Sequence, residues 1–288
     1  MKALAEFAMR GRRQSILAAV LCTSLPMMFI VGAALVGLTF LRKGLSQGVV
    51  VLGWAILPAL GWLILSADPS PLLVVIGTAA LAAVLRTSVS WSYSLIASLV
   101  IGVICGSMLQ WLAPEVIQAL VEAGGKMIAE ANMEQLKQLD QAQIDLFLEQ
   151  LMISMSSAAH VVFMLMGLML ARYWQSALYN PGGFQQEFHA LRIPGQLAMA
   201  LIAVVMLGGS ISPAISGWLP LITVPFAVSG LALAHGLVGK RDLGRGWIVG
   251  LYVLLVMAMP YMYTVLVIAA VVDSLADFRS RTETATPV

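Results

Sequence analysis

Long uncharged apolar tracts alternate with short charged segments along most of the chain. A helix needs roughly 20 apolar residues to cross the hydrocarbon core of a bilayer. Eight tracts approach that length, at residues 14–41, 48–66, 70–85, 91–113, 151–171, 194–210, 215–239 and 246–272. The pattern therefore predicts an all-α, polytopic transmembrane helical bundle, with residues 1–288 forming a single membrane domain.

The first and last tracts are longer than one span requires. Residues 14–41 contain 28 uncharged positions, which would reach about 42 Å as one straight helix. Pro26 interrupts the first tract and Pro260 the last, and basic residues stand at both ends of each. Both tracts could therefore be Pro-broken hairpins that return to the side they entered, or tilted and kinked single spans. Broken helices of this kind often mark binding sites in transporters.

The distribution of lysine and arginine favours the hairpins, because cytoplasmic loops of membrane proteins carry an excess of these residues. If every tract crosses once, the 16 basic residues divide equally between the two sides. If the first and last tracts are hairpins, 14 basic residues share one side and only Lys126 and Lys137 face the other. This threading predicts a multi-pass protein of the bacterial cytoplasmic (inner) membrane with its N-terminus in the cytoplasm.

The composition excludes an ordinary soluble domain, since only 10% of the residues are charged against about 25% in soluble proteins. The basic residues are spread over short loops rather than gathered in one patch, which argues against nucleic acid as a partner. The lipid bilayer is the partner that the composition predicts.

Residues 113–150 form the one long polar segment, and their acids outnumber their lysines by seven to two. Apolar residues recur there at helical spacing, which predicts an amphipathic insertion outside the cytoplasm. Gly124 and Gly125 are expected to separate two helices. These helices could lie on the bilayer, cap the bundle or gate a cavity, and the sequence leaves all three open.

Residues 172–194 are predicted to form a cytoplasmic loop that contains a strong turn signal, Asn180-Pro-Gly-Gly183. Its glycines could present backbone N–H groups to an anion, although two glycines in a turn are a weak motif and the pattern favours a plain connecting loop. Helical spacing from Phe184 to Leu191 predicts a short amphipathic helix that lies on the membrane or docks a partner. The candidate ligand or partner residues are Arg172, Asn180, Gly182, Gly183, Phe184, Phe188 and Arg192.

Few residues in the apolar tracts could carry chemistry. Only His160 and His235 stand within apolar sequence as candidate intramembrane polar residues, and each could simply bond a backbone carbonyl. Ionisable residues inside a membrane are usually functional, and their scarcity here argues against an ion-driven antiporter. We find no phosphate-loop, metal-protease or nucleophile-elbow motif. The sequence therefore predicts no enzymatic activity, no cofactor and no metal site.

The order of these features resembles the YybS-like family of uncharacterised bacterial multispanning membrane proteins. The segments that carry the resemblance are Gly11-Arg-Arg-Gln-Ser-Ile-Leu-Ala-Ala-Val20, Leu41-Arg-Lys-Gly44, the acidic insertion, Tyr179-Asn-Pro-Gly-Gly-Phe184, Phe188-His-Ala-Leu-Arg-Ile-Pro194 and Asp273-Ser-Leu-Ala-Asp-Phe-Arg279. That family is distantly similar to the S-components of energy-coupling-factor transporters, which bind small substrates and depend on separate ATPase subunits.

The resemblance implies a small-molecule-binding transporter subunit with an ATPase-type coupling protein as partner. Such a subunit should hold a closed cavity near its outer face. The alternative function is a non-transporting membrane scaffold or assembly partner in envelope biogenesis, and a lipid-handling role is a third possibility. The sequence does not decide between these functions.

Overall fold

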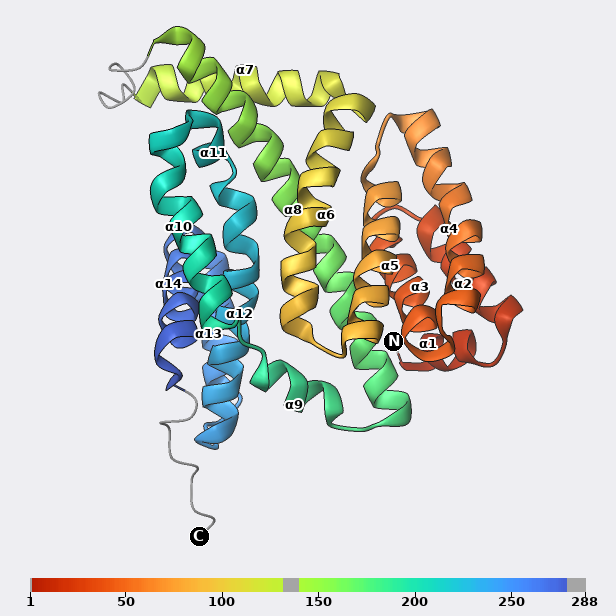
Figure 1. Ribbon diagram of the computed structural model, residues 1–288. Coiled ribbons are helices and arrows are strands. Elements are labelled where there is room, and N and C mark those ends of the chain that lie inside the picture. The colour runs from red at the N-terminus through yellow and green to blue at the C-terminus, as the bar shows by residue number, and fades with distance from the viewer. Residues whose placement is uncertain (1, 132–139, 279–288) are drawn as a thin grey trace.

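The computed structural model describes residues 2–131 and 140–278, and within these ranges the protein is built from helices (Figure 1). Together the helices form the predicted all-α bundle. Those of the first half are α1 (Lys2–Met9), α2 (Arg12–Ser24), α3 (Phe29–Lys43), α4 (Leu45–Ser66), α5 (Ser70–Ser88), α6 (Trp91–Leu112) and α7 (Pro114–Ala131). Those of the second half are α8 (Gln141–Tyr179), α9 (Gly183–Ala190), α10 (Gly195–Ile211), α11 (Pro213–Gly217), α12 (Leu219–Lys240), α13 (Gly246–Met257) and α14 (Met259–Ala276).

Six of the described helices are long and apolar enough to cross a membrane, namely α4, α5, α6, α8, α12 and α14. A seventh span arises if α9 and α10 are taken together, although the chain bends by 53° between them. The protein is therefore a multi-pass membrane protein. Two tracts differ from the prediction. The tract at 194–210 forms α10, which has only 17 residues, whereas part of the last tract forms α14, which is long enough to cross a membrane by itself.

The first tract forms the predicted hairpin. α2 ends at Ser24 and α3 begins at Phe29, with Pro26 in the break. The Nζ atom of Lys43, at the end of α3, donates to Oγ of Ser15, at the start of α2, over 3.2 Å. The two ends of the tract therefore lie together, and the tract enters and leaves on the same side.

The last tract is also a hairpin, but its two arms are unequal. α13 has 12 residues and α14 has 18, and the break falls at Ala258. Pro260 sits in the first turn of α14, where a helix tolerates proline because the N–H there has no intrahelical partner. The end of α14 returns to the start of α10, since a Cβ atom at Gly195 would lie 3.0 Å from the carbonyl oxygen of Ser274.

The polar insertion is organised differently from the prediction. α7 runs without interruption through Gly124 and Gly125, which were expected to separate two helices. A Cβ atom at Gly124 would lie 3.2 Å from Cε of Met152 on α8, so the small residue allows the helices to approach closely. The second amphipathic stretch is the first part of α8, which the Asp140 side chain caps. Lys137 and the other residues of 132–139 lie outside the described residues.

Basic residues gather at one end of the bundle, drawn at the bottom of Figure 1. We call this the basic end. Twelve of the thirteen described basic residues lie there, at the helix ends and turns that meet at this level, and Lys126 on α7 is the exception. Arg279 and Arg281, which the prediction placed on the same side, lie outside the described residues. The arrangement agrees with the threading in which the first and last tracts are hairpins.

The interior between α3, α5 and α8 is filled with side chains. Leu35 and Leu38 of α3, Leu81 of α5 and Trp174 of α8 are all less than 2% exposed. Small residues bring the backbones together, because a Cβ atom at Gly37 would stand 3.2 Å from Cβ of Ala171. Close contact of this kind is how membrane helices associate without a hydrophobic driving force. These helices are a packed framework, against which the turn after α8 is held.

Candidate functional site

The turn that follows α8 is tighter than the predicted loop. Residues 172–179 belong to the last turns of α8, so only residues 180–182 connect it to α9. Gly182 has a φ of 86°, a left-handed conformation that favours glycine. The N–H of Gly183 donates to the Asn180 carbonyl over 3.0 Å, and that of Phe184 donates to Oγ of Ser176 over 3.0 Å. Of the two glycine N–H groups that were expected to bind an anion, that of Gly183 is therefore already used within the turn.

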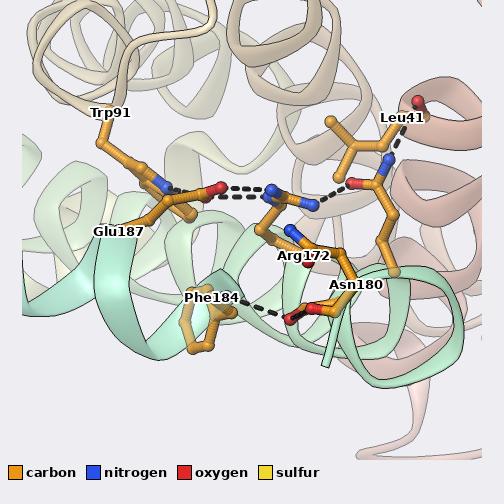
Figure 2. A network of polar contacts seen from close by, with 8 residues as sticks. Leu41, Trp91, Arg172, Asn180, Phe184 and Glu187 are labelled. Atoms are coloured by element: carbon orange, nitrogen blue, oxygen red, sulfur yellow. Dashed lines mark hydrogen bonds and ion pairs between the residues drawn. The ribbon is translucent and has the colours of Figure 1, made fainter. Parts of the chain in front are cut away.

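A polar cluster joins the end of α8 to α9 and α6, as Figure 2 shows. Arg172 donates through Nε to Oε2 of Glu187 over 2.9 Å, and its Nη2 pairs with Oε1 of the same carboxylate. Nε1 of Trp91 donates to Oε2 of Glu187 over 3.1 Å. Gln175 accepts from Arg172 over 2.8 Å and donates to the Leu41 carbonyl over 3.3 Å. We call Trp91, Arg172, Gln175 and Glu187 the polar anchor.

The charge of Glu187 is stabilised by this cluster. Partial burial would raise the pKa of the carboxyl, but the hydrogen bonds from Arg172 and Trp91 and the charge of Arg172 outweigh burial and hold the pKa below its usual value. The carboxylate is therefore ionised at neutral pH. The bidentate geometry also fixes the direction of α9, because both oxygens are held.

A groove of about 900 Å³ opens beside α9 at the basic end. We call it the aromatic groove. Its apolar wall is formed by Met169, Leu170, Tyr173, Phe184, Phe188 and Tyr252, and its polar lining includes Lys2, Ser176, Gln185, His189 and His235. Met169 precedes Ala177, another lining residue, by eight positions on α8, so the groove runs about 12 Å along that helix.

Five rings follow one another along this groove. Their centroids are 6.3 Å apart between Tyr173 and Phe184, 5.8 Å between Phe184 and Phe188, 5.4 Å between Phe188 and His235, and 5.8 Å between His235 and Tyr252. The rings come from α8, α9, α12 and α13. Aromatic pairs prefer offset-stacked or edge-to-face contacts; Phe184 and Phe188 are stacked, and the other three pairs meet edge-to-face. The groove thus has a continuous aromatic wall built from four helices.

The structure brings some of the predicted site residues together and separates others. Gly182, Phe184, Phe188 and His235 line the aromatic groove. Arg172 lies in the polar anchor, and Asn180 and Gly183 belong to the turn, where the Asn180 main-chain carbonyl accepts from the Ser176 hydroxyl and from the N–H of Gly183.

The two remaining candidates lie elsewhere. Arg192 pairs with Asp277 at the end of α14 over 2.8 Å. His160 is 9% exposed within α8, where its Nδ1 is 2.7 Å from the Ser156 carbonyl oxygen and its Nε2 is 3.1 Å from Oγ of Ser70. Both residues tie helices together, and neither contributes to the groove.

Sequence reasoning missed Lys2, Trp91, Glu187 and Tyr252. Glu187 could have been found, because it is the single acidic residue in the basic segment 172–194 and so suggested an ion pair. Trp91 stands at the start of an apolar tract, where an indole N–H needs a polar partner. Lys2 and Tyr252 gave no such signal, since they reach the site only through the packing of distant helices.

Comparison with known proteins adds no identification. No protein-family model, no curated protein sequence and no solved structure matches the chain. The resemblance to the YybS-like family therefore stays a prediction from the sequence.

Proposed function

We propose that this protein is a small-molecule-binding subunit of a transport system in the bacterial inner membrane, with its N-terminus in the cytoplasm. The observation that carries the proposal is the aromatic groove. Ligand sites are typically concavities of about 300–1,000 Å³ with apolar walls and a few polar groups, and this groove matches that description in volume and lining. An ATPase-type coupling protein is the partner that the proposal requires.

The position of the groove changes the expected route of the ligand. A transporter subunit that captures its substrate from outside should have its site at the end opposite to the basic residues. The groove instead opens at the basic end, which the positive-inside rule assigns to the cytoplasm. The proposal is therefore for binding from the cytoplasmic side or from the inner leaflet.

Small molecules that remain with the purified protein test the proposal. The intact chain would be extracted in mild detergent and its bound small molecules identified by mass spectrometry. Ala177→Trp fills the groove, whereas Ala159→Trp places the same side chain on an exposed position of the same helix. We expect a stoichiometric molecule in the wild type and in Ala159→Trp, and its loss in Ala177→Trp. Equal retention in all three proteins would contradict a site in the groove.

The orientation has a test of its own. Gln186 on α9 and Gln118 on α7 are both exposed, at opposite ends of the bundle. A cysteine at position 118 should react with an impermeant maleimide in spheroplasts, and a cysteine at position 186 should react only after lysis. The native Cys22 and Cys105 are buried and provide the background. The reverse order of labelling would refute a cytoplasmic basic end.

The alternative function is a membrane scaffold or assembly partner in envelope biogenesis, and α13 is the observation that favours it. The structure describes all of α13, and none of its residues is buried. A Cβ atom at Gly246 or Gly250 would meet nothing within 4 Å. Crosslinking from Val253 on this helix should capture a membrane protein if the chain is a scaffold, and only lipid if it is not.

A further inference from the structure

We propose that the aromatic groove takes an anionic amphiphile, a molecule with a negatively charged head and one apolar tail. This inference deepens the proposed function and rests on it. It follows from how polar and apolar side chains are distributed along the groove, from the charge of its lining, and from the direction in which it runs.

The residues of the apolar wall of the groove come from α8, α9 and α13. Met169 and Leu170 are the lining residues of α8 that are farthest from the turn, about two helical turns above Ala177. Phe188 and Tyr252 face the same space from α9 and α13. Methionine adapts its shape to different apolar ligands, and the rings provide flat, rigid walls. This part of the groove is suited to an alkyl chain or a flat hydrocarbon tail.

The polar residues of the lining come from α1, α8, α9 and α12, and they include His189 and His235. Lys2 supplies a positive charge and Gln185 supplies hydrogen-bond donors, whereas the Ser176 hydroxyl already donates to the Asn180 carbonyl. None of the described lining residues is acidic. The lysine pairs with Glu6 over 3.8 Å, but both side chains are about half exposed or more, and such pairs contribute little. The ammonium group can therefore bind an anionic head group.

The bundle geometry relates this site to the bilayer. The turn at residues 180–182 lies at the basic end, and the groove runs from it along α8 toward the middle of the bundle. The tail of an amphiphile in the inner leaflet runs in the same direction, from the membrane surface toward the middle of the bilayer. Two sources share this chemistry, a phospholipid of the membrane and a free single-chain amphiphile from the cytoplasm.

The test uses the full chain in nanodiscs of zwitterionic phosphatidylcholine, with bound molecules counted by native mass spectrometry. The probes are dodecyl phosphate, dodecanol and dodecyltrimethylammonium, which share one tail and differ in head charge. We expect dodecyl phosphate to be retained at least about tenfold more than the other two. Lys2→Gln should reduce that retention about tenfold, Ala177→Trp should abolish it, and Arg10→Gln, a nearby exposed basic position outside the groove, should leave it unchanged.

A second set of nanodiscs, doped with anionic phosphatidylglycerol, separates the two sources. Selective retention of phosphatidylglycerol, lost in Ala177→Trp, would identify a membrane lipid as the ligand, and retention of dodecyl phosphate alone would identify a free amphiphile. Equal retention of the three dodecyl probes, or retention that Ala177→Trp does not change, would overturn the inference. If a neutral or water-soluble molecule occupies the groove, the inference fails and the proposed function stands. If nothing binds in the groove, both fail.

Discussion

The polar anchor should stabilise the protein mainly through the coupling between Arg172 and Glu187. The Arg172 side chain is 17% exposed and that of Glu187 is 34% exposed, so the burial of this pair is intermediate between that of a surface ion pair and that of a fully buried one. Removing one partner of a buried pair costs about 3–5 kcal/mol, and an exposed pair contributes about 0–1 kcal/mol. We therefore expect Glu187→Ala to cost about 2–3 kcal/mol, because Arg172 and the Trp91 N–H both lose their acceptor.

The assay is thermal unfolding of the purified protein in one detergent at fixed concentration. A loss of about 2–3 kcal/mol corresponds to a decrease in Tm of roughly 5–10 °C for a chain of this size. Hydrogen exchange should rise first in α9, since the anchor attaches this helix to α6 and α8. The measurement thus has both a global and a local readout.

A double-mutant cycle decides whether the two residues act as a pair. Arg172→Met and Glu187→Met each leave a charge without its partner, whereas the double variant replaces the whole pair by apolar side chains. We expect the double variant to lose about 1–2 kcal/mol less than the sum of the single losses. Additive losses would refute the argument, because they would mean that the two side chains contribute independently.

Three further predictions use the same unfolding assay. The stability that the ionised Glu187 contributes should be complete above its ordinary pKa of 4.5 and lost as the pH falls through its lower folded-state pKa. Glu187→Gln should lack this part of the acid sensitivity. An acid-unfolding profile that Glu187→Gln leaves unchanged would contradict the lowered pKa of Glu187. Arg192→Ala should cost less than about 1 kcal/mol, because the Arg192 and Asp277 side chains are 34% and 45% exposed. A loss as large as that of Glu187→Ala would contradict the argument that the contribution of an ion pair grows with its burial. Gly230→Ala should lower stability by about 1–3 kcal/mol, since its Cβ atom would collide with the backbone of Leu266 on α14, whereas Gly53→Ala, with nothing within 4 Å, should be neutral or slightly stabilising.

Much of the fold could be predicted because the length of an apolar tract indicates a membrane helix and the charges at its two ends indicate how the helix is oriented. The tract at 91–113 corresponds to α6 (Trp91–Leu112), and the distribution of lysine and arginine by itself predicts the two hairpins. Pro26 lies in the break of the first hairpin, and Pro260 follows the break of the second by two residues. The amphipathic helix at 184–191 corresponds to α9 (Gly183–Ala190).

The remainder depended on tertiary contacts that have no local pattern. Gly124 and Gly125 resemble a helix break in sequence, yet the approach of α8 makes small residues favourable there. Trp91 and Glu187 are 96 residues apart and meet only when α6 and α9 are in place. The aromatic groove is likewise invisible in the sequence, because its rings come from four helices. Its apolar residues look the same as those that face lipid.

α8 is one unbroken helix of 39 residues, about 58 Å long, and it therefore exceeds the thickness of a bilayer core by nearly a factor of two. Its first turns carry the acidic insertion, and its last turns carry the polar anchor and one wall of the aromatic groove. Because α8 packs against α3, α5, α6 and α12, several neighbours fix its position at once. One continuous helix thus joins the α7 end of the bundle directly to the aromatic groove at the basic end, with no break in its backbone between them.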